Sequence, residues 1–424
     1  MKKLKAILIG AGSRGIGYTD IMAELPDKFE VVAVAEPIEN RREYIKNKHN
    51  INEEFCFDDW KPLLELGKIA DVAVICTMDR DHYDVALKAI DLGYDMLLEK
   101  PVTPEPEECY EIVHRAEEKG VRIVVCHVLR YTPLYMKIKD IIDDGKLGRI
   151  MSINHEECVG NLHQSHSFVR GNWGNSKKTS TMLLQKTCHD MDILQWLLNK
   201  KCKKVQSYGK LSYFTKENAP EGSPDYCVQG CPVSDSCPYY SVKVYLDDKD
   251  NHWFRSTCTK NAEPTDELVE EAIRNTQYGK CVFKCDNDVV DHQTVNLLFE
   301  DDITVTFTMN AFNKGGRFIH IMGTKGELHA SSADDAPYIK VYDFETKETT
   351  EIPMTGVEGI NGGHGGGDEG IINALYDYIT DCYTGKSIPT FRQSCDNHAI
   401  VFAAEKARED GIIVDIDEFI KSFE

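Results

Sequence analysis

Three glycines near the N-terminus have the spacing G-x-G-x-x-G, at Gly10, Gly12 and Gly15. They follow an apolar run, Leu4–Ile9, that is expected to be a strand, and a helix can begin after them. In such a turn the first glycine permits the tight bend and the second admits a pyrophosphate against the backbone. The third lets strand and helix pack closely, with the helix N-terminus facing the phosphates. The spacing therefore predicts a dinucleotide-binding turn, and the alternative is a plain turn between a strand and a helix.

Glu36 indicates which dinucleotide this turn would accept. It follows the second expected strand, Phe29–Ala35, and lies 21 residues beyond Gly15. A carboxylate at this point accepts hydrogen bonds from both ribose hydroxyls and repels a 2′-phosphate, so Glu36 favours NAD over NADP. Arg41 and Arg42 leave NADP open as an alternative, because a guanidinium that is not simply solvated on a helix could reach such a phosphate.

A dense group of thiols lies in a polar, proline-bearing stretch from about residue 216 to 285. Cys227, Cys231 and Cys237 have the spacing C-x3-C-x5-C. A fourth ligand could be any of three further cysteines, Cys258, Cys281 or Cys285. Thiolates in a reducing compartment bind a structural zinc ion or, less often, an iron–sulfur cluster. The spacing is weaker than paired C-x2-C motifs, so free structural thiols remain the alternative. In either case we assign the group to folding and not to catalysis.

Between residues 155 and 173 lies a polar stretch that suits a sugar. It ends with Arg170-Gly171-Asn172-Trp173. An indole packs on the C–H face of a sugar, and a guanidinium binds hydroxyls or carboxylates, so we expect Arg170 and Trp173 to contact the substrate. Three histidines in the same stretch could bind sugar hydroxyls or a metal ion if they are not simply solvated, namely His155, His163 and His166.

A second loop, at residues 362–368, reads Gly-Gly-His-Gly-Gly-Gly-Asp. So many glycines permit a close approach of the backbone to a ligand, with His364 pointing into a pocket. The alternative is that Asp368 simply caps the following helix. We expect His364 to contact the substrate.

These residues need a scaffold, and the first 150 residues alternate apolar runs with helical patterns. Continuous apolar strands separated by helices indicate a parallel sheet that is covered on both faces, which predicts a doubly wound α/β domain. Helices are expected over Asp81–Leu92 and Pro106–Lys119. The expected strands are Leu4–Ile9, Phe29–Ala35, Asp71–Thr77, Asp95–Glu99 and Val121–His127.

After about Arg149 the expected strands lie close together, which indicates a large, mostly antiparallel open sheet. We expect an NAD-binding domain over residues 1–128 and an α/β domain for substrate binding and oligomerisation over 129–424. The C-terminal segment, with an expected helix over Glu369–Tyr383, can pack back on the first domain. The expected strands of the second domain are Met151–Glu157, Val205–Phe214, Val289–Glu300, Ile303–Met309, Arg317–Met322 and Tyr338–Phe344.

Composition limits the class of partner. The chain of 424 residues is 42% hydrophobic, and its formal net charge of −21 argues against nucleic acid as the main partner. No apolar run approaches the ~20 residues that a transmembrane helix needs. The basic start of the chain also lacks the apolar region of a signal peptide. With 15 cysteines interpreted as reduced thiols, these features predict a cytoplasmic protein without a membrane or nucleic-acid partner.

Four further motifs agree with one another. They are Asp81-His82 at the start of an expected helix, Glu99-Lys100-Pro101 after the next strand, Arg130-Tyr131-Thr132-Pro133, and His189-Asp190-Met191-Asp192. With the glycine turn, the combination closely resembles the Gfo/Idh/MocA family of sugar and inositol dehydrogenases over essentially the whole chain. The resemblance implies a Rossmann domain followed by an α/β domain with a large open sheet. It also implies a homodimer or homotetramer.

By this resemblance Lys100 lies near the nicotinamide and the reacting hydroxyl, where an ammonium stabilises alkoxide character. His189 is the expected general base, and Asp192 on the same helical face orients its ring or binds substrate hydroxyls. The alternatives are a solvated lysine and a histidine that merely begins a helix. Arg130 and Tyr131 are further expected substrate contacts. The expected cofactor contacts are Gly10, Gly12, Ser13, Arg14, Gly15, Glu36, Thr77, His82, Glu99, Lys100 and Pro101.

The sequence departs from the family at one position. The family commonly has an aspartate four residues before this histidine, and here Gln185 stands there, followed by Lys186. Because glutamine carries no charge, the usual Asp–His pairing is absent. We expect an NAD-dependent oxidoreductase acting on a secondary hydroxyl of a sugar, polyol or glycoside. Two alternatives stay open: a redox-neutral glycosidase or lyase that oxidises a ring position transiently, and a non-catalytic NAD- or sugar-sensing protein.

Overall fold

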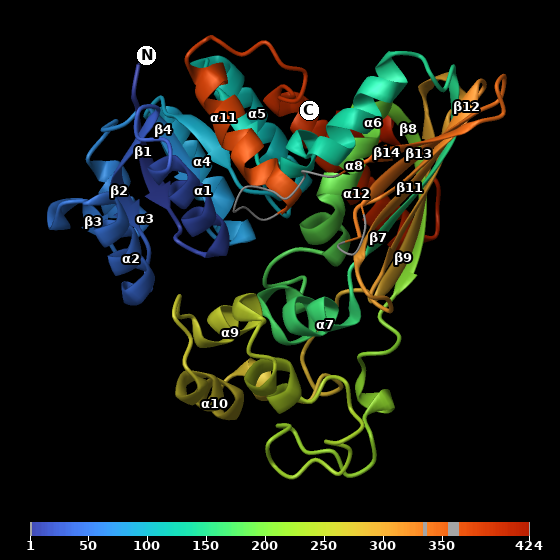
Figure 1. Ribbon diagram of the computed structural model, residues 1–424. Helices are drawn as coiled ribbons and strands as arrows, with labels where there is room; N and C mark the ends of the chain where they lie inside the picture. Colours follow the sequence, from blue (N-terminus) through green and yellow to red (C-terminus); the bar gives the residue numbers. More distant parts are fainter. Residues whose placement is uncertain (1, 334–336, 355–363, 424) are drawn as a thin grey trace.

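The computed structural model describes residues 2–333, 337–354 and 364–423, which form two sheets with helices packed on them (Figure 1). The first sheet has six parallel strands in the order β3-β2-β1-β4-β5-β6. Its central strand β4 is apolar and buried along its whole length, and β1 is so except for Lys5, as expected for strands that are covered on both faces. The strands are β1 (Leu4–Ile9), β2 (Phe29–Ala35), β3 (Cys56–Phe57), β4 (Val72–Ile75), β5 (Asp95–Leu98) and β6 (Ile123–Val125).

Helices cover both faces of this sheet. One apolar layer contains residues of α1 (Ser13–Ala23) and of α11 (Gly367–Ile379), so α11 packs here although it follows the second sheet in the chain. The opposite layer contains residues of α3 (Trp60–Glu65), α4 (His82–Asp91) and α5 (Pro106–Lys119). A further helix, α2 (Glu39–His49), follows β2.

The second sheet has nine strands in the order β14-β13-β12-β11-β7-β10-β9-β8-β15, and only the β7–β10 pair is parallel among the described strands. Strand β10 shows why one face is buried, since its valine, phenylalanine and methionine alternate with exposed or half-exposed threonines. The strands are β7 (Ile150–Cys158), β8 (Cys202–Lys210), β9 (His292–Phe299), β10 (Thr304–Asn310), β11 (Gly316–Gly323), β12 (Gly326–Ser331), β13 (Tyr338–Asp343), β14 (Thr349–Pro353) and β15 (Val414–Asp415).

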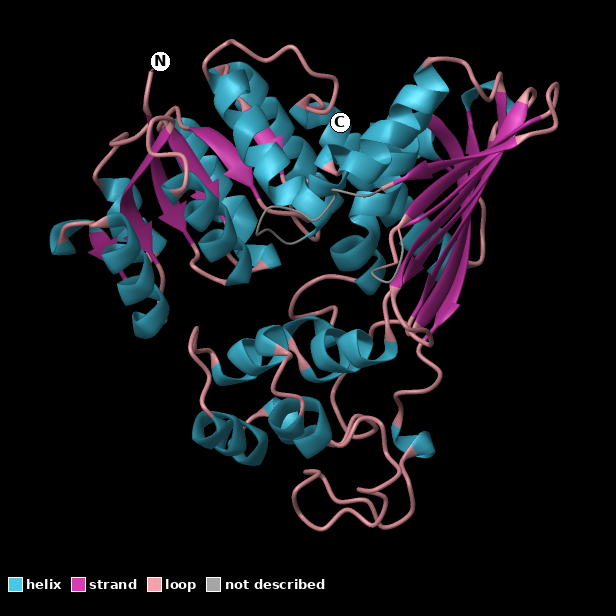
Figure 2. Cartoon of the chain, viewed as in Figure 1, coloured by secondary structure: helices cyan, strands magenta, loops and turns pink. Residues whose placement is uncertain are grey.

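Three helices lie against the buried face of this sheet in one apolar core. They are α6 (Pro133–Asp143), α8 (Met182–Leu198) and α12 (Phe391–Asp410), and α13 (Ile416–Lys421) lies at the edge of the same core. The view in Figure 2 shows these helices on one side of the sheet only. Helix α12 also contributes Cys395 to the core of the parallel sheet, so it packs between the two sheets. The expected fold class is thereby confirmed.

The segment between β8 and β9 forms a small lobe beneath the two sheets (Figure 1). It contains α9 (His252–Thr259) and α10 (Asp266–Asn275), and it packs against α7 (Asn161–His163) and the π-helical turns at Gln164–Arg170. The lobe has two small apolar clusters of its own, separate from the sheet cores. None of the helices that the structure describes has the length and apolar character needed to cross a membrane.

Candidate active site

The glycine turn leaves an open space against its backbone. A Cβ atom on Gly10 would lie 2.4 Å from the carbonyl oxygen of Cys76, and one on Gly15 would lie 2.1 Å from the oxygen of Gly10. A Cβ atom on Gly12 would meet nothing within 4 Å, and α1 begins at Ser13 with no side-chain cap and no acidic residue in its first turn. Uncapped N–H groups at the start of a helix favour an anion, so the turn fits a pyrophosphate.

The carboxylate of Glu36 lies beside this turn. Its side chain is buried, with Oε2 accepting a hydrogen bond from the N–H of Ala11 at 2.6 Å and Oε1 from the N–H of Ile38 at 2.9 Å. These bonds hold the carboxylate at the carboxyl end of β2, where dinucleotide-binding sheets receive the adenosine ribose. The position fits the predicted preference for NAD.

Thr77 and His82 lie on the other side of the turn, after β4. The Thr77 hydroxyl is buried and has no hydrogen-bond partner among the residues that the structure describes. His82 is also buried, with Nδ1 2.8 Å from the carbonyl oxygen of Pro101 and Nε2 3.2 Å from that of Thr77. The imidazole thus connects two backbone segments, so its ring nitrogens are not free for the predicted cofactor contact by His82.

Arg14 connects the turn to the C-terminal segment. Its guanidinium forms ion pairs with Glu99 at 3.0 Å and with Asp368 of α11 at 2.6 Å. Burial opposes ionisation of Glu99, but Arg14 and Lys100 outweigh it and hold the pKa of Glu99 below its ordinary value. Asp368 therefore anchors α11, whose N-cap position is held by Gly366, and it does not cap the helix as considered above. The side chains of Arg14 and Glu99 are occupied by each other, so their cofactor contacts would come from the backbone.

Lys100 follows β5 of the parallel sheet, whereas His189 lies in α8, which packs on the nine-stranded sheet. The side chain of Lys100 reaches the turn of α8 that bears His189. The ammonium of Lys100, at the carboxyl end of β5, donates a hydrogen bond to the carbonyl oxygen of Gln185 at 2.5 Å. In an α-helix that carbonyl pairs with the N–H group four residues later, which is that of His189. Lys100 precedes Pro101 through a cis peptide bond. Lys100 thus contacts the turn of α8 that bears His189, at the carboxyl end of β5.

Asp192 is paired with Arg130 and does not lie free beside His189. Both residues are buried, and Nε and Nη2 of Arg130 donate to the two carboxylate oxygens at 2.6 and 2.7 Å. Asn397 of α12 donates to the same carboxylate at 2.5 Å. Burial raises the pKa of Asp192, but Arg130 outweighs it and keeps that pKa below its ordinary value. This pairing speaks against the predicted sugar contacts by both residues, because their polar atoms are engaged with each other.

Comparison with known proteins places this geometry in a family. Residues 4–127 match the oxidoreductase family's NAD-binding Rossmann fold, and residues 139–416 match its C-terminal alpha/beta domain. The chain belongs to the Gfo/Idh/MocA oxidoreductase family.

Its similarity to individual members is low but extends over much of the chain. It is 25% identical to the Bacillus subtilis protein YteT over 343 residues, 76% of each protein. It is 27% identical to the inositol 2-dehydrogenase of Salmonella typhimurium over 206 residues, which span 48% of this chain and 57% of that enzyme. The crystal structure of an oxidoreductase domain protein from Kribbella flavida superposes with a TM-score of 0.71 at 17% identity, covering 98% of this chain and all of that one. The last likeness shows the fold.

Two histidines of this Gfo/Idh/MocA protein that the sequence did not single out lie behind His189. The His127 ring is 6.1 Å from that of His189 and 5.6 Å from that of His398. Burial lowers the pKa of His127 to about 4 and that of His398 to about 3. The N–H of Val102 donates to Nε2 of His398 at 3.1 Å, which connects α12 to the segment Lys100–Val102 after β5. Neutral imidazoles therefore form the wall behind the predicted base.

A second polar network lies on the sheet side of α8, next to Gln185. Lys186 pairs with Glu157 of β7 at 3.2 Å, and Arg317 of β11 pairs with Glu157 at 2.6 Å and with Asp190 at 2.8 Å. His155 lies 2.8 Å from Asp190, so it is a buried residue of β7 and not a loop ligand. Burial lowers the pKa of Lys186 although Glu157 opposes the shift. Lys186 and Arg317 are charged residues in an otherwise apolar helix and strand, and this pattern could have indicated a buried polar network.

The remaining predicted substrate residues are placed differently from one another. The indole N–H of Trp173 is 3.5 Å from Asp79, which follows β4, so Trp173 bridges the parallel sheet and the segment before α8. Tyr131 is buried against Gly370 of α11. The loop at 362–363 lies outside the described residues, as does the side chain of His364.

Arg170, His163 and His166 turn toward the lobe between β8 and β9, which we call the insertion. The guanidinium of Arg170 is buried and donates to carbonyl oxygens of Lys280 and Tyr239, which speaks against a substrate contact. His166 stacks on Phe254 with ring centroids 4.1 Å apart. In the described chain, ligand atoms of three metal-binding side chains lie within 4.8 Å of one another only at His320, Glu327 and His329.

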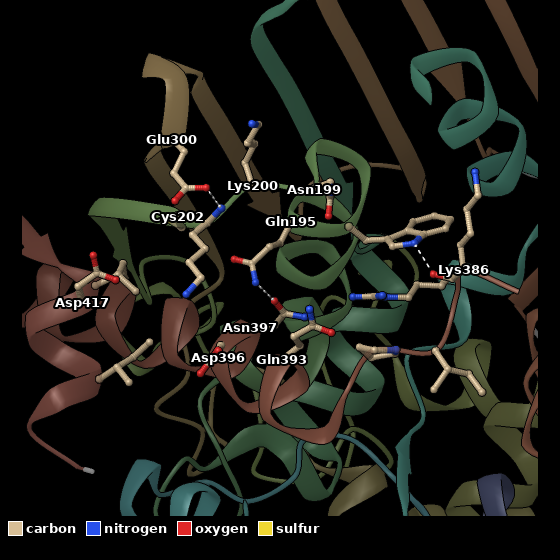
Figure 3. A pocket seen from close by; sticks show the side chains of 17 residues that line it. Gln195, Asn199, Lys200, Cys202, Glu300, Lys386, Gln393, Asp396, Asn397 and Asp417 are labelled. Atoms are coloured by element: carbon tan, nitrogen blue, oxygen red, sulfur yellow. Dashed lines mark hydrogen bonds between the residues drawn. The ribbon is translucent and has the colours of Figure 1, made fainter. Parts of the chain in front are cut away.

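A cleft of about 390 Å³ lies at the other end of α8 (Figure 3). Gln195 and Asn397 point toward each other there, and the amide of Gln195 donates to Asn397 at 2.6 Å. Neither the glycine turn nor Lys100 or His189 lines this cleft. The cleft backs onto the Arg130–Asp192 pair and is not the candidate active site.

Proposed function

We propose that this protein transfers a hydride between NAD and a secondary hydroxyl of a sugar, polyol or glycoside. The observation that carries the proposal is the hydrogen bond from Lys100 to the helical turn that begins at Gln185 and bears His189. It lies at the carboxyl ends of the parallel strands, the edge at which open α/β sheets bind ligands. The family to which the chain belongs supports the same chemistry.

The roles follow from the chemistry of each group. His189 takes the proton of the substrate hydroxyl, since an imidazole with a pKa of ~6.5 in water can accept a proton near neutral pH. Lys100 donates a hydrogen bond to the same oxygen and stabilises its negative charge. Bound NAD supplies the hydride acceptor, with Glu36, Thr77 and the backbone of the glycine turn as its contacts. Trp173 and His364 are the proposed sugar contacts.

Arg130, Asp192 and Asn397 act in this proposal as positioning residues. Their mutual hydrogen bonds fix the middle of α8 against α12 and the loop after β6. A fixed helix keeps His189 within reach of the hydroxyl that Lys100 contacts. A buried network of this kind specifies one arrangement because each partner is left unsatisfied if another moves.

Gln185 favours a second candidate function, redox-neutral cleavage of a glycoside. In that reaction the ring is oxidised transiently, the acidified neighbouring C–H permits elimination, and the cofactor is restored. Gln185 contributes its carbonyl oxygen to Lys100, and its side chain carries no charge that could pair with His189. The base is then tuned differently from that of members with an aspartate at this position.

A substrate screen distinguishes the candidates. Sugars, polyols and aryl glycosides are incubated with the protein and NAD while NADH absorbance and aglycone release are followed together. Net NADH supports the dehydrogenase, and cleavage without net NADH supports the redox-neutral reaction. Tight NAD binding with neither signal would identify a sensing protein and overturn both.

We also propose that the protein resides in the cytoplasm and forms a homodimer or homotetramer through the uncovered face of the nine-stranded sheet. All 15 cysteines are free, as in a reducing compartment. Large apolar side chains stand on the uncovered face, with Tyr208 63%, Met151 41% and Phe318 37% exposed. Light scattering of the wild type and of Tyr208→Glu tests this, and a monomeric wild type would contradict it.

A further inference from the structure

A small cavity at the insertion is lined by four cysteines and one arginine. It has a volume of about 10 Å³, and its lining includes Arg170 and the sulfur-bearing residues Cys227, Cys231, Cys237 and Cys281. A cavity of this size has room for a single small ion. The four cysteines therefore share one site although Cys281 is remote from the other three in sequence.

Backbone pairing brings the two cysteine segments together. The N–H of Cys227 donates to the carbonyl oxygen of Gly279 at 2.8 Å, and the N–H of Cys281 donates to that of Asp225 at 2.8 Å. A β-bridge between Tyr226 and Lys280 lies between these two hydrogen bonds. The fold thus fixes which cysteine joins the C-x3-C-x5-C group.

The two other candidates for a fourth ligand lie outside the cavity lining. The thiol of Cys285 is 3.4 Å from the carbonyl oxygen of Cys281, and that of Cys258 is 3.3 Å from the carbonyl oxygen of Arg255 in α9. Cys258 belongs to a separate apolar cluster with Phe254 and Tyr278. Cys281 is therefore the fourth thiol.

Arg170 supplies the argument for an anionic centre in this cavity. Its side chain is 2% exposed, and no carboxylate forms an ion pair with it among the residues that the structure describes. Its hydrogen-bond partners are the carbonyl oxygens of Lys280 at 2.8 Å and Tyr239 at 2.6 Å, and the sulfur of Cys227 at 3.6 Å. Its guanidinium also lies 5.8 Å from the centre of the Tyr245 ring, which carries no net charge. Its Nη1 atom is buried without a described hydrogen-bond partner. A buried charge without a counter-charge is costly, and four neutral thiols do not compensate it.

We propose that Cys227, Cys231, Cys237 and Cys281 bind one zinc ion as thiolates, with Arg170 as the counter-cation of the site. Four thiols release four protons to solvent when the ion binds, so the centre carries a net charge of −2. Arg170 stays protonated and donates N–H groups to the Cys227 thiolate. A donor of this kind orients a metal ligand and tunes its basicity.

Zinc binding would bring the four sulfur atoms closer together than they are in the structure. Tetrahedral zinc with Zn–S bonds of about 2.3 Å holds its sulfurs about 3.8 Å apart. No three of these thiols lie mutually within 4.8 Å, because the described chain meets that limit only at His320, Glu327 and His329. The residues from 227 to 240 form turns without regular helix or strand, so the loop can draw inward without breaking a sheet.

Metal content tests the proposal directly. The full-length protein, expressed with zinc in the medium, should contain about one zinc per chain by elemental analysis. Stripping with a chelator should lower the unfolding temperature, and added zinc should restore it. Cobalt in place of zinc should give thiolate-to-cobalt absorption bands. Zinc-free protein that neither gains stability from zinc nor shows these bands overturns the proposal, and so does iron with acid-labile sulfide.

Substitutions assign the ligands and the arginine. Cys281→Ser and Cys231→Ser should each lose the stoichiometric zinc, and Cys258→Ser is the matched control that keeps it, since its thiol is buried in the same lobe. Arg170→Met should weaken zinc binding by about 10- to 100-fold in competition with a chelator, and Arg170→Lys by less. Equal zinc loss in Cys258→Ser and Cys281→Ser, or unchanged affinity in Arg170→Met, contradicts the assignment. NAD binding reports that each variant is folded, and none of these readouts depends on the hydride reaction.

Discussion

Polar side chains have opposite environments at the edge of the parallel sheet and in the insertion. At the carboxyl ends of the parallel strands, Glu36, Thr77 and Lys100 lie along one edge of the sheet, next to an open glycine turn. In the insertion and the turns at Gln164–Arg170 that pack against it, Arg170 and His166 are turned inward and almost fully buried. Polar groups at a sheet edge serve a ligand, whereas polar groups inside a small lobe hold the lobe together. Substitutions in the first region should change chemistry with little effect on stability, and those in the insertion should do the reverse.

The largest effect is expected for the proposed acid–base pair. Lys100→Ala and His189→Ala should each lower turnover by about 10²- to 10⁴-fold, because each removes a group that acts on the same proton transfer. The double variant should lose less than the product of the two effects. Turnover on a confirmed substrate, NAD affinity and the unfolding midpoint are measured together, and only turnover should change.

Two surface substitutions serve as controls for this pair. Lys146 and His114 are exposed, and Lys146→Ala and His114→Ala should leave turnover unchanged. Near-normal turnover in His189→Ala would move the base elsewhere, to Lys100 or to His364. A large fall in the unfolding midpoint of Lys100→Ala or His189→Ala would contradict the expectation that residues at the sheet edge contribute little to stability.

Arg130 tests the boundary of the comparison, because it lies near the site but is turned inward. Arg130→Met leaves the buried carboxylate of Asp192 without its counter-charge, which should cost about 3–5 kcal/mol of unfolding free energy. Adding Asp192→Leu should recover part of this loss, since no charge then stays buried. Denaturant unfolding gives the measurement.

The control for Arg130 is an exposed ion pair. Arg115 and Asp91 are 44% and 41% exposed, so Arg115→Met should change the unfolding free energy by about 1 kcal/mol or less. If Arg130→Met is as mild as Arg115→Met, the Arg130–Asp192 pair does not hold α8 in place.

Five of the six strands of the parallel sheet could be predicted from the sequence, because local signals determine them, although β4 and β6 are shorter than expected. β1 and β2 have the expected bounds, and α5 matches Pro106–Lys119 because a proline begins it and Gly120 ends it in a left-handed conformation.

Short or polar strands could not be predicted. β3 was missed because its two residues, Cys56–Phe57, are too few to show an alternation of buried and exposed side chains. β14 was missed because its residues, TTEIP, are mostly polar.

The site could be predicted only where one segment carries the signal. The glycine turn with Glu36 is such a case, and so are Lys100 and His189 through their family motifs. Arg130 and Asp192 are 62 residues apart, and Asn397 lies 205 residues beyond Asp192, so no local pattern could show that they satisfy one another. The contacts of Arg170 could not be predicted for the same reason, since its partners lie 57 to 110 residues away.

The contact between the insertion and the turns at Gln164–Arg170 should lose stability in acid through His166. Its ring stacks on Phe254 and its Nδ1 is 3.1 Å from the hydroxyl of Tyr245. Burial, and then Arg170, lowers the pKa of His166 to about 3. Between that pH and the unfolded value of ~6.5, only the unfolded chain binds the proton, so stability falls as the pH falls through this window. At pH 5 the loss is about 2 kcal/mol relative to pH 7.5.

His166→Phe should remove this part of the pH dependence, because phenylalanine fills the aromatic stack and binds no proton. Unfolding free energies at pH 7.5 and pH 5 should then differ by about 2 kcal/mol less than in the wild type. NAD affinity at pH 7.5 should be unchanged, because His166 packs against the insertion and not at the edge of the parallel sheet. An unaltered pH dependence in the variant would show that His166 is not the group responsible.

The smallest expected effect concerns Glu36, which separates charge from geometry at the sheet edge. Glu36→Ala removes the acceptor for ribose hydroxyls and the bond to the N–H of Ala11, so NAD affinity should fall about tenfold, the equivalent of one charge-assisted hydrogen bond of about 1.5 kcal/mol. Glu36→Gln keeps an acceptor oxygen for Ala11 but loses the negative charge, so it should relieve the repulsion of a 2′-phosphate while retaining more NAD affinity. Titration with NAD and NADP should therefore show the ratio of the two affinities narrowing in both variants, with the unfolding midpoint nearly unchanged.

A wild type that already prefers NADP would contradict this prediction. The 2′-phosphate of NADP would then be bound by Arg41 or Arg42, and Glu36 would not determine the choice of cofactor. If the unfolding midpoint falls and the NAD-to-NADP affinity ratio does not change, the main role of Glu36 is structural, through its hydrogen bonds to the backbone N–H groups of Ala11 and Ile38.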